Sequence, residues 1–210
     1  MPFNIWPEMQ PGNPDQETNP MQQDVYAAAL RQYSTAHLLQ LFSKLEAPTI
    51  SEMNGEYAAC LLAQPNWMAT KLGQLALSNP MGSWLCKAFR PLDANNGRGY
   101  NSFRQRGKVV QRYPMQTMIA ASRFDGRPAY QLVYRHFHSL CGDINMVDEV
   151  RRVAPGVYLG IGTWGFTRGQ RHIPYPFLLE GPQAAYRGDI GRARHNFFIG
   201  KREVPALFNS

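Results

Sequence analysis

The sequence predicts a mostly-β protein, an antiparallel barrel or sandwich with helices at its N-terminal side. From residue 108 onward the chain consists of short segments rich in β-branched and aromatic residues, separated by Gly, Pro or Asp. Residues 22–45 instead carry apolar side chains at helical spacing. Strands joined by short connections favour an antiparallel fold over an α/β fold, in which helices alternate with strands.

Composition supports a single folded domain. The chain has 210 residues, of which 44% are hydrophobic and 18% charged, so it is long and apolar enough to bury a substantial core. Residues 1–20 are rich in Pro, Asn and Gln and predict a flexible N-terminal arm. We expect residues 21–210 to form one domain, helical over 21–80 and β-rich over 81–200.

Charge and cysteine content limit the cellular setting and the partners. The 22 Lys and Arg residues exceed the 15 Asp and Glu residues, giving a net charge of +7, which permits an anionic partner without identifying one. Cys60, Cys86 and Cys141 are odd in number and widely spaced, which fits neither a disulfide framework nor a zinc ribbon. No secretory signal pattern opens the sequence and no apolar run has the length of a membrane span. The sequence therefore predicts a soluble cytoplasmic protein.

The N-terminal part predicts two helices, a strand and a third helix. Apolar positions over 22–45 predict two amphipathic helices that break near Ser34-Thr35, where a hydroxyl can cap the second helix. A strand is expected after Gly55. A helix is expected over 66–78, ending before Pro80 because the residue before proline disfavours helix.

The remaining chain predicts a series of strands. Residues 93–100 read as a loop by composition, and Asp125-Gly126 predicts a tight hairpin turn in which both residues take positive φ. The expected strands are Trp84–Phe89, Lys108–Tyr113, Met115–Ser122, Ala129–His138, Asn145–Val153, Val157–Trp164, Pro176–Glu180 and Asn196–Gly200.

One predicted strand gathers chemically versatile side chains. Because side chains alternate across a strand, Tyr130, Leu132, Tyr134, His136 and His138 are expected to share one face. In a barrel such a face can form the aromatic wall of a ligand site, with hydroxyl and imidazole groups orienting the ligand. The alternative is that these side chains fill a packed barrel core.

The same face suggests acid–base catalysis. His136 or His138 is expected to act as the base, assisted by Tyr130, Tyr134 or Glu149, because the histidine pKa lies near working pH. Such a site can run an isomerisation, cyclisation or dehydration without a cofactor, and we predict none. A metal is the alternative, since two histidines at i and i+2 can share an ion with a third ligand. That ligand would come from Asp143, Asp148, Glu149 or His172, but our prediction includes no metal.

Two further residues are candidate ligand contacts. Trp164 follows a strand punctuated by glycines, which can bend at a barrel rim, so it is expected either to face a ligand or to plug the rim. Arg151 is expected near the barrel mouth, where a guanidinium can bind a carboxylate or phosphate of the ligand. The C-terminal arginines, interleaved with Tyr186, Phe197 and Phe198, offer nucleic-acid binding as an alternative, although no helix-turn-helix or RNP pattern accompanies them.

A resemblance to a known family extends the fold prediction. Ser83–Phe89 (SWLCKAF) resembles the W-x-G-K-x-F element of small bacterial lipocalin-like proteins that are named for a GXWXG motif and carry a C-terminal domain of unknown function. Val147–Val153, Gly156–Gly160 and Pro176–Glu180 are similar to segments of that domain, and the likeness covers roughly residues 50–180. The sequence departs from the pattern near residue 57, where Tyr57 and Ala59 replace the namesake Trp and second Gly, and at residue 86, where Cys86 replaces Gly.

The resemblance implies a lipocalin-like, or calycin-like, β-barrel and assigns no activity, because that family is not tied to one function. Together with the residues above, it predicts a barrel that binds a small, largely apolar molecule, which can carry an acidic group. The first alternative is a cofactor-independent isomerase, cyclase or hydro-lyase, and the second is a basic nucleic-acid-binding protein. The sequence does not determine the oligomeric state.

Overall fold

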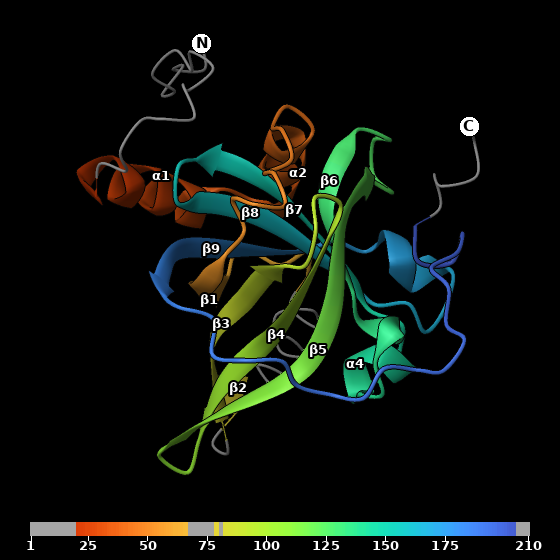
Figure 1. The fold of residues 1–210 in the computed structure, drawn as a ribbon. Coiled ribbons are helices and arrows are strands. Elements are labelled where there is room, and N and C mark those ends of the chain that lie inside the picture. Colours follow the sequence, from red (N-terminus) through yellow and green to blue (C-terminus); the bar gives the residue numbers. More distant parts are fainter. Residues whose placement is uncertain (1–19, 67–77, 80–81, 205–210) are drawn as a thin grey trace.

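The computed structural model describes residues 20–66, 78–79 and 82–204, and these form an antiparallel barrel with two helices packed outside it (Figure 1). The sheet order is β1-β9-β8-β7-β6-β5-β4-β3-β2, and pairing of β1 with β3 closes eight of the strands into a ring. Strands β3 to β9 follow one another in sequence around the ring, which is the up-and-down order of lipocalin-like barrels. The predicted fold class is confirmed.

The strand bounds are β1 Gly55–Leu61, β2 Ser78–Asn79, β3 Gly82–Pro91, β4 Asn96–Gln105, β5 Lys108–Ala121, β6 Pro128–Val133, β7 Val147–Ala154, β8 Val157–Thr163 and β9 Tyr175–Ala184. The helices are α1 Pro20–Gln32, α2 Thr35–Phe42 and α4 Leu140–Asp143, with 3₁₀ turns η1 Tyr134–His136 and η2 Gly169–His172.

The two N-terminal helices form as the sequence predicts. They break at Ser34, whose hydroxyl caps α2 by accepting a hydrogen bond from the His37 N–H at 3.3 Å. Leu30, Leu38 and Phe42 are buried against the outer faces of β8 and β9, which present apolar side chains there. Burial of this apolar stripe, more than helix propensity, holds α1 and α2 on the barrel. The helix expected over 66–78 and the arm expected over 1–20 lie almost wholly outside the described residues.

Four strand predictions differ from the structure. The two strands expected on either side of Pro114 are one continuous strand, β5. A bulge accommodates the proline: Tyr113 takes a φ of 52°, the pairing with β4 shifts register there, and the strand continues beyond it. Strand β4 begins at Asn96, inside the expected loop. Residues 196–200 form no strand, and β6 ends at Val133 instead of continuing to His138.

The β5–β6 hairpin is confirmed, but its turn is not the predicted one. Six residues, 122–127, connect the two strands, and of the Asp125-Gly126 pair only Gly126 has a positive φ, at 73°. Asp125 instead accepts a hydrogen bond from the Arg127 N–H at 3.0 Å. A short Asp-Gly signal therefore predicted the hairpin correctly and its loop length incorrectly.

The barrel interior is rich in aromatic side chains. Tyr57, Phe89, Tyr130 and Tyr158 are almost fully buried and meet edge to face or tilted, with ring centroids 5.5–5.6 Å apart. Ile50 and Met53, in the loop that precedes β1, are buried in the same cluster of side chains. The loop thus covers one end of the barrel.

Beyond β9 the chain crosses the outside of the barrel over β4 and β5 toward α4 (Figure 1). We call residues 185–194 the C-terminal strap. Asp189 pairs with Arg90 at 2.8 Å and with Arg98 at 3.3 Å, and Ala193 forms an isolated bridge with Phe137.

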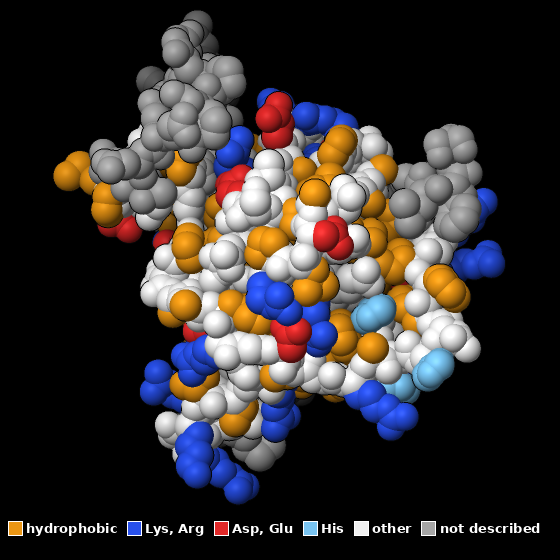
Figure 2. Space-filling model, in the orientation of Figure 1, with side chains coloured by type: hydrophobic (Ala, Val, Ile, Leu, Met, Phe, Trp, Pro, Cys, Tyr) orange, Lys and Arg blue, Asp and Glu red, His pale blue; other side chains and the backbone are white. Residues whose placement is uncertain are grey.

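The excess positive charge is visible on the surface. Figure 2 shows Lys and Arg side chains gathered where the β4–β5 hairpin projects from the barrel, and Arg104, Arg106 and Lys108 are exposed there. Within the described part of the chain, no helix is both long and apolar enough to cross a membrane.

Candidate functional site in the barrel interior

A buried ion pair lies inside the barrel. The Lys87 ammonium contacts Asp148 Oδ2 at 2.7 Å, and the two side chains are only 4% and 3% exposed. Lys87 also donates to Asn101 Oδ1 at 3.1 Å and to the Tyr134 hydroxyl at 2.5 Å. All three ammonium protons therefore have acceptors, as a buried charge requires.

Tyr134 and Asn101 complete the network. The Tyr134 hydroxyl donates to Asp148 Oδ2 at 2.9 Å and accepts from Asn101 Nδ2 at 3.2 Å. The indole N–H of Trp84 donates to Asn101 Oδ1 at 3.1 Å. We call Trp84, Lys87, Asn101, Tyr134 and Asp148 the interior polar cluster.

The fold gathers the cluster at one end of the barrel. Trp84 lies near the start of β3, Lys87 and its pairing partner Asn101 lie at the middle of β3 and β4, and Asp148 is the second residue of β7. Neighbouring strands are antiparallel, so the start of β3 with Trp84 and the start of β7 with Asp148 share one end, opposite the end covered by Ile50 and Met53, and Lys87 and Asn101 reach toward that end from mid-strand. The 3₁₀ turn η1, directly after β6, places Tyr134 there.

Aromatic rings surround the ammonium. The Lys87 Nζ lies 5.1–5.3 Å from the ring centroids of Trp84, Tyr134 and Phe177, a distance at which the ring faces attract a cation. Phe177 fits because Gly160 on β8 has no side chain: a Cβ at Gly160 would lie 2.1 Å from the Phe177 ring. The Lys87–Asp148 ion pair is therefore enclosed by aromatic side chains.

The electrostatics keep the neutral groups protonated. Burial, and then the charge of Asp148, raises the pKa of Tyr134 well above its ordinary value. Burial, and then the same carboxylate, raises the pKa of Cys141 to about 12, with Lys87 offsetting part of the rise. The raised pKa values thus keep the Tyr134 phenol, inside the cluster, and the neighbouring Cys141 thiol protonated at neutral pH. A phenol that donates to a carboxylate and accepts from an ammonium is positioned to pass a proton.

Three of the residues predicted from strand alternation lie in the interior. Tyr130, Leu132 and Tyr134 are buried in the same cluster of side chains, and the Tyr130 hydroxyl donates to Thr117 Oγ1 at 2.8 Å. Tyr130 and Leu132 take part in the packed core, whereas Tyr134 joins the interior polar cluster.

His136 and His138 do not share that face. The chain leaves the sheet after Val133, so the alternation expected to continue through His138 stops, and that expectation is wrong. His136 is half-buried against the rings of Phe137 and Phe197, and burial, together with Arg98, lowers its pKa. His138 is exposed, and its N–H donates to the Arg192 carbonyl in the strap at 3.0 Å. Across the part of the chain that the structure describes, no three His, Cys, Asp or Glu side chains gather as a metal site.

Glu149 and Arg151 lie on the outer face of β7, because Asp148 and Val150 take the inward positions. Glu149 accepts a hydrogen bond from the Arg123 N–H at 2.9 Å, and burial raises the pKa of its carboxyl group, offset in part by that bond. Arg151 has no exposed surface. Its guanidinium holds Asp125 with two hydrogen bonds of 2.6 and 2.7 Å.

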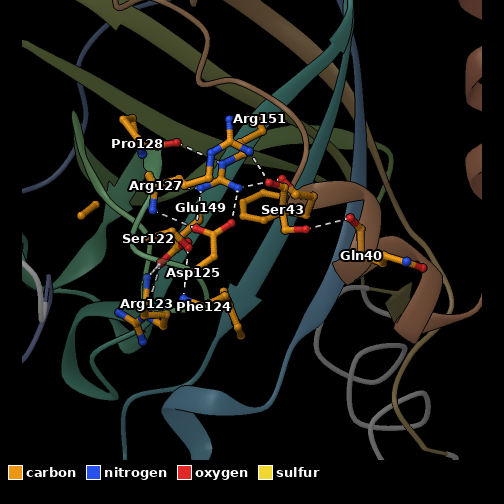
Figure 3. Close-up of polar contacts among 12 residues, drawn as sticks. Gln40, Ser43, Ser122, Arg123, Phe124, Asp125, Arg127, Pro128, Glu149 and Arg151 are labelled. Atoms are coloured by element: carbon orange, nitrogen blue, oxygen red, sulfur yellow. Dashed lines mark hydrogen bonds and ion pairs between the residues drawn. The ribbon is translucent and has the colours of Figure 1, made fainter. Parts of the chain in front are cut away.

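Figure 3 shows the Arg151 guanidinium between the β5–β6 loop and the end of α2. It donates to the Phe42 carbonyl at 2.7 Å and lies 4.4 Å from the Phe42 ring centroid. Arg127, in the same loop, donates to the Ser43 carbonyl. The Arg151 contacts join β7 to α2 and to the hairpin loop, and the Arg127 contact joins that loop to the residue after α2, so the partners of Arg151 lie outside the barrel. Trp164, just after β8, is half-buried and stacks on Tyr175 with centroids 5.9 Å apart.

Lys87 and Asn101 were not among the site residues predicted from the sequence, and Asp148 was predicted only as a candidate metal ligand. A signal was present for two of them. Lys87 is the one charged residue between Trp84 and Phe89 in a strand that is otherwise apolar on that face, and Asp148 stands two residues before inward-facing Val150. A lone charge on an apolar strand face predicts a buried partner, but the partner's position needs the fold.

No protein-family model matches the sequence, and no curated protein matches it. A crystal structure of a protein from Thermomonospora curvata matches 76% of this chain and 95% of its own, with 15% sequence identity and a TM-score of 0.49.

Proposed function

We propose that the barrel binds a small, largely apolar molecule, with the interior polar cluster contacting its polar group. The observation that carries this proposal is the Lys87–Asp148 ion pair, held at 2.7 Å inside an aromatic shell. A buried ion pair adds little to stability compared with well-packed apolar residues, so stability alone is a weak reason for its presence. Apolar walls with a few convergent polar groups are the common composition of small-molecule sites.

The resemblance described from the sequence gives this proposal a second support. Trp84 and Lys87 belong to the segment similar to the W-x-G-K-x-F element, and Asp148 belongs to Val147–Val153. These two segments are about 60 residues apart, and their side chains meet in the interior polar cluster. We propose that the chain is related to the GXWXG-motif proteins through this pair of segments.

Binding can be tested with the apolar fluorophore N-phenyl-1-naphthylamine. We expect saturable fluorescence enhancement with wild type, and a Kd at least about fivefold different for Tyr134→Phe, because one hydrogen bond in a buried site is worth about 1 kcal/mol. Tyr175→Phe is the matched control, since Tyr175 lies outside the cluster and stacks on Trp164. Enhancement that does not saturate, or that both variants change equally, would refute the proposal.

A cofactor-independent isomerase, cyclase or hydro-lyase is the second candidate, and the position of the Tyr134 hydroxyl favours it. That hydroxyl contacts Lys87 Nζ at 2.5 Å and Asp148 Oδ2 at 2.9 Å, so a proton can pass between ligand, phenol and carboxylate while the ammonium stabilises negative charge. In this candidate enzyme, Tyr134 and Asp148 take the acid–base role that the sequence suggested for His136 and His138.

The enzyme candidate is tested by solvent exchange. A molecule that co-purifies with the protein is extracted, returned to the protein in deuterium oxide, and examined by mass spectrometry. Catalysis predicts deuterium incorporation or conversion that Tyr134→Phe abolishes and His136→Ala retains. Incorporation lost in His136→Ala and kept in Tyr134→Phe would instead support the histidine site; an unchanged molecule supports binding alone.

A further inference from the structure

The hydrogen-bonding groups of the interior polar cluster are satisfied with one exception. Lys87 uses its three donors, the Tyr134 hydroxyl donates once and accepts twice, and Asn101 bonds through both its oxygen and its nitrogen. Asp148 Oδ2 accepts from Lys87 and Tyr134. Asp148 Oδ1 is buried and has no hydrogen-bond partner among the described residues.

The unpartnered oxygen lies over a strand position without a side chain. Asp148 pairs with Gly162 across β7 and β8, and a Cβ placed on Gly162 would lie 3.1 Å from Asp148 Oδ1. The thiol of Cys141 is close enough for its pKa to respond to Asp148, but no hydrogen bond joins the two. A buried carboxylate oxygen without a donor is costly, so this atom requires one.

We propose that Asp148 Oδ1 accepts a hydrogen bond from the bound molecule, and that the ligand class is therefore an apolar molecule with a hydroxyl or N–H group. This inference rests on the proposed binding function and narrows its ligand. An acidic ligand, which the basic composition suggested, does not match, because a carboxylate brings another acceptor to an atom that lacks a donor. An ether or ketone fails for the same reason.

The test compares four probes of nearly equal size: 2-naphthol, 2-methoxynaphthalene, 2-naphthoate and naphthalene. We expect 2-naphthol to bind about tenfold or more tightly than 2-methoxynaphthalene, the factor that one hydrogen bond to a charged group supplies. The other two probes should bind no better than the ether. Affinities are measured by isothermal titration calorimetry at a pH where the naphthol is neutral.

Two variants assign the preference to this oxygen. In Asp148→Asn the amide oxygen has to accept from Lys87 and Tyr134, which leaves the NH₂ group at the place of Oδ1. The site then offers a donor, and the preference for naphthol over the ether should fall to about twofold or less. Gly162→Ala keeps both charged residues and places a methyl group against Oδ1, so it should reduce the same preference even if Asp148→Asn does not fold.

The results distinguish failure of the proposed hydrogen bond to Asp148 Oδ1 from failure of the proposed binding function. If naphthol and its methyl ether bind wild type equally, the inference is wrong and the binding function stands. A preference for naphthol that persists unchanged in Gly162→Ala also overturns the inference, because the donor then meets another atom. If none of the four probes binds, both proposals fail.

Discussion

At the scale of single residues, the Lys87–Asp148 pair should behave as a unit. Lys87→Met leaves Asp148 as an unpaired buried charge, and we expect it to lower the free energy of unfolding by about 3–5 kcal/mol. The double variant Lys87→Met/Asp148→Leu removes both charges and should recover most of that loss. Urea denaturation of Lys87→Met, Asp148→Leu and the double variant measures the coupling.

The exposed pair Arg90–Asp189 provides the control for this cycle. Its side chains are 39% and 35% exposed, so Arg90→Met should cost about 1 kcal/mol or less. A double variant at positions 87 and 148 that is no more stable than Lys87→Met would show that the two charges do not depend on each other.

At the scale of elements, Arg151 joins α2 to the β5–β6 hairpin loop. Its planar guanidinium binds Asp125 through two hydrogen bonds and donates to the Phe42 carbonyl, a geometry that a lysine cannot reproduce. Arg151→Lys should therefore destabilise the fold by about 2–4 kcal/mol. Thermal unfolding by circular dichroism tests this, with Arg152→Lys as the control at a neighbouring, partly exposed position that should change little. Equal effects of the two variants would argue against the role of Arg151.

The same loop should give the protein part of its acid sensitivity. Burial alone would raise the pKa of Asp125, but hydrogen bonds from Arg151 and from the Arg127 N–H outweigh it and hold the pKa below its ordinary value. A carboxylate with a depressed pKa stabilises the folded state above its unfolded pKa of about 4, and that contribution disappears as the pH falls through the folded value. Asp125→Asn should therefore be less stable than wild type at neutral pH and lose less stability between about pH 5 and pH 2. Parallel pH profiles for the two proteins would contradict this.

The sequence predicted some secondary-structure elements and contacts correctly and others wrongly. Local signals sufficed for the α1–α2 break at Ser34 and for the inward positions of Tyr130 and Leu132 on β6, because capping and strand alternation act over a few residues. Strand alternation gave a wrong prediction beyond Val133, because no pattern in the sequence of Tyr134–His138 predicts the 3₁₀ turn. The Lys87–Asp148 pair joins strands that are not neighbours in the sheet, so it depends on barrel closure and stagger, which strand patterns do not specify.

At the scale of the whole molecule, the C-terminal strap and the barrel should respond separately to mutation. The strap crosses β4 and β5, and Asp189 anchors it through Arg90 and Arg98, both of them partly exposed contacts that contribute little to global stability (Figure 1). The barrel closes through its own β1–β3 pairing, without the strap. Asp189→Ala should therefore raise hydrogen exchange across residues 186–191 while the amides of β3 and β4 stay protected, because local opening needs much less free energy than global unfolding. Asp143→Ala, which removes the partner of Arg194 at the far end of the strap, should loosen only the residues next to it. If Asp189→Ala instead speeds exchange throughout β3 and β4, the strap is part of the cooperative unit that keeps the barrel closed around the interior polar cluster.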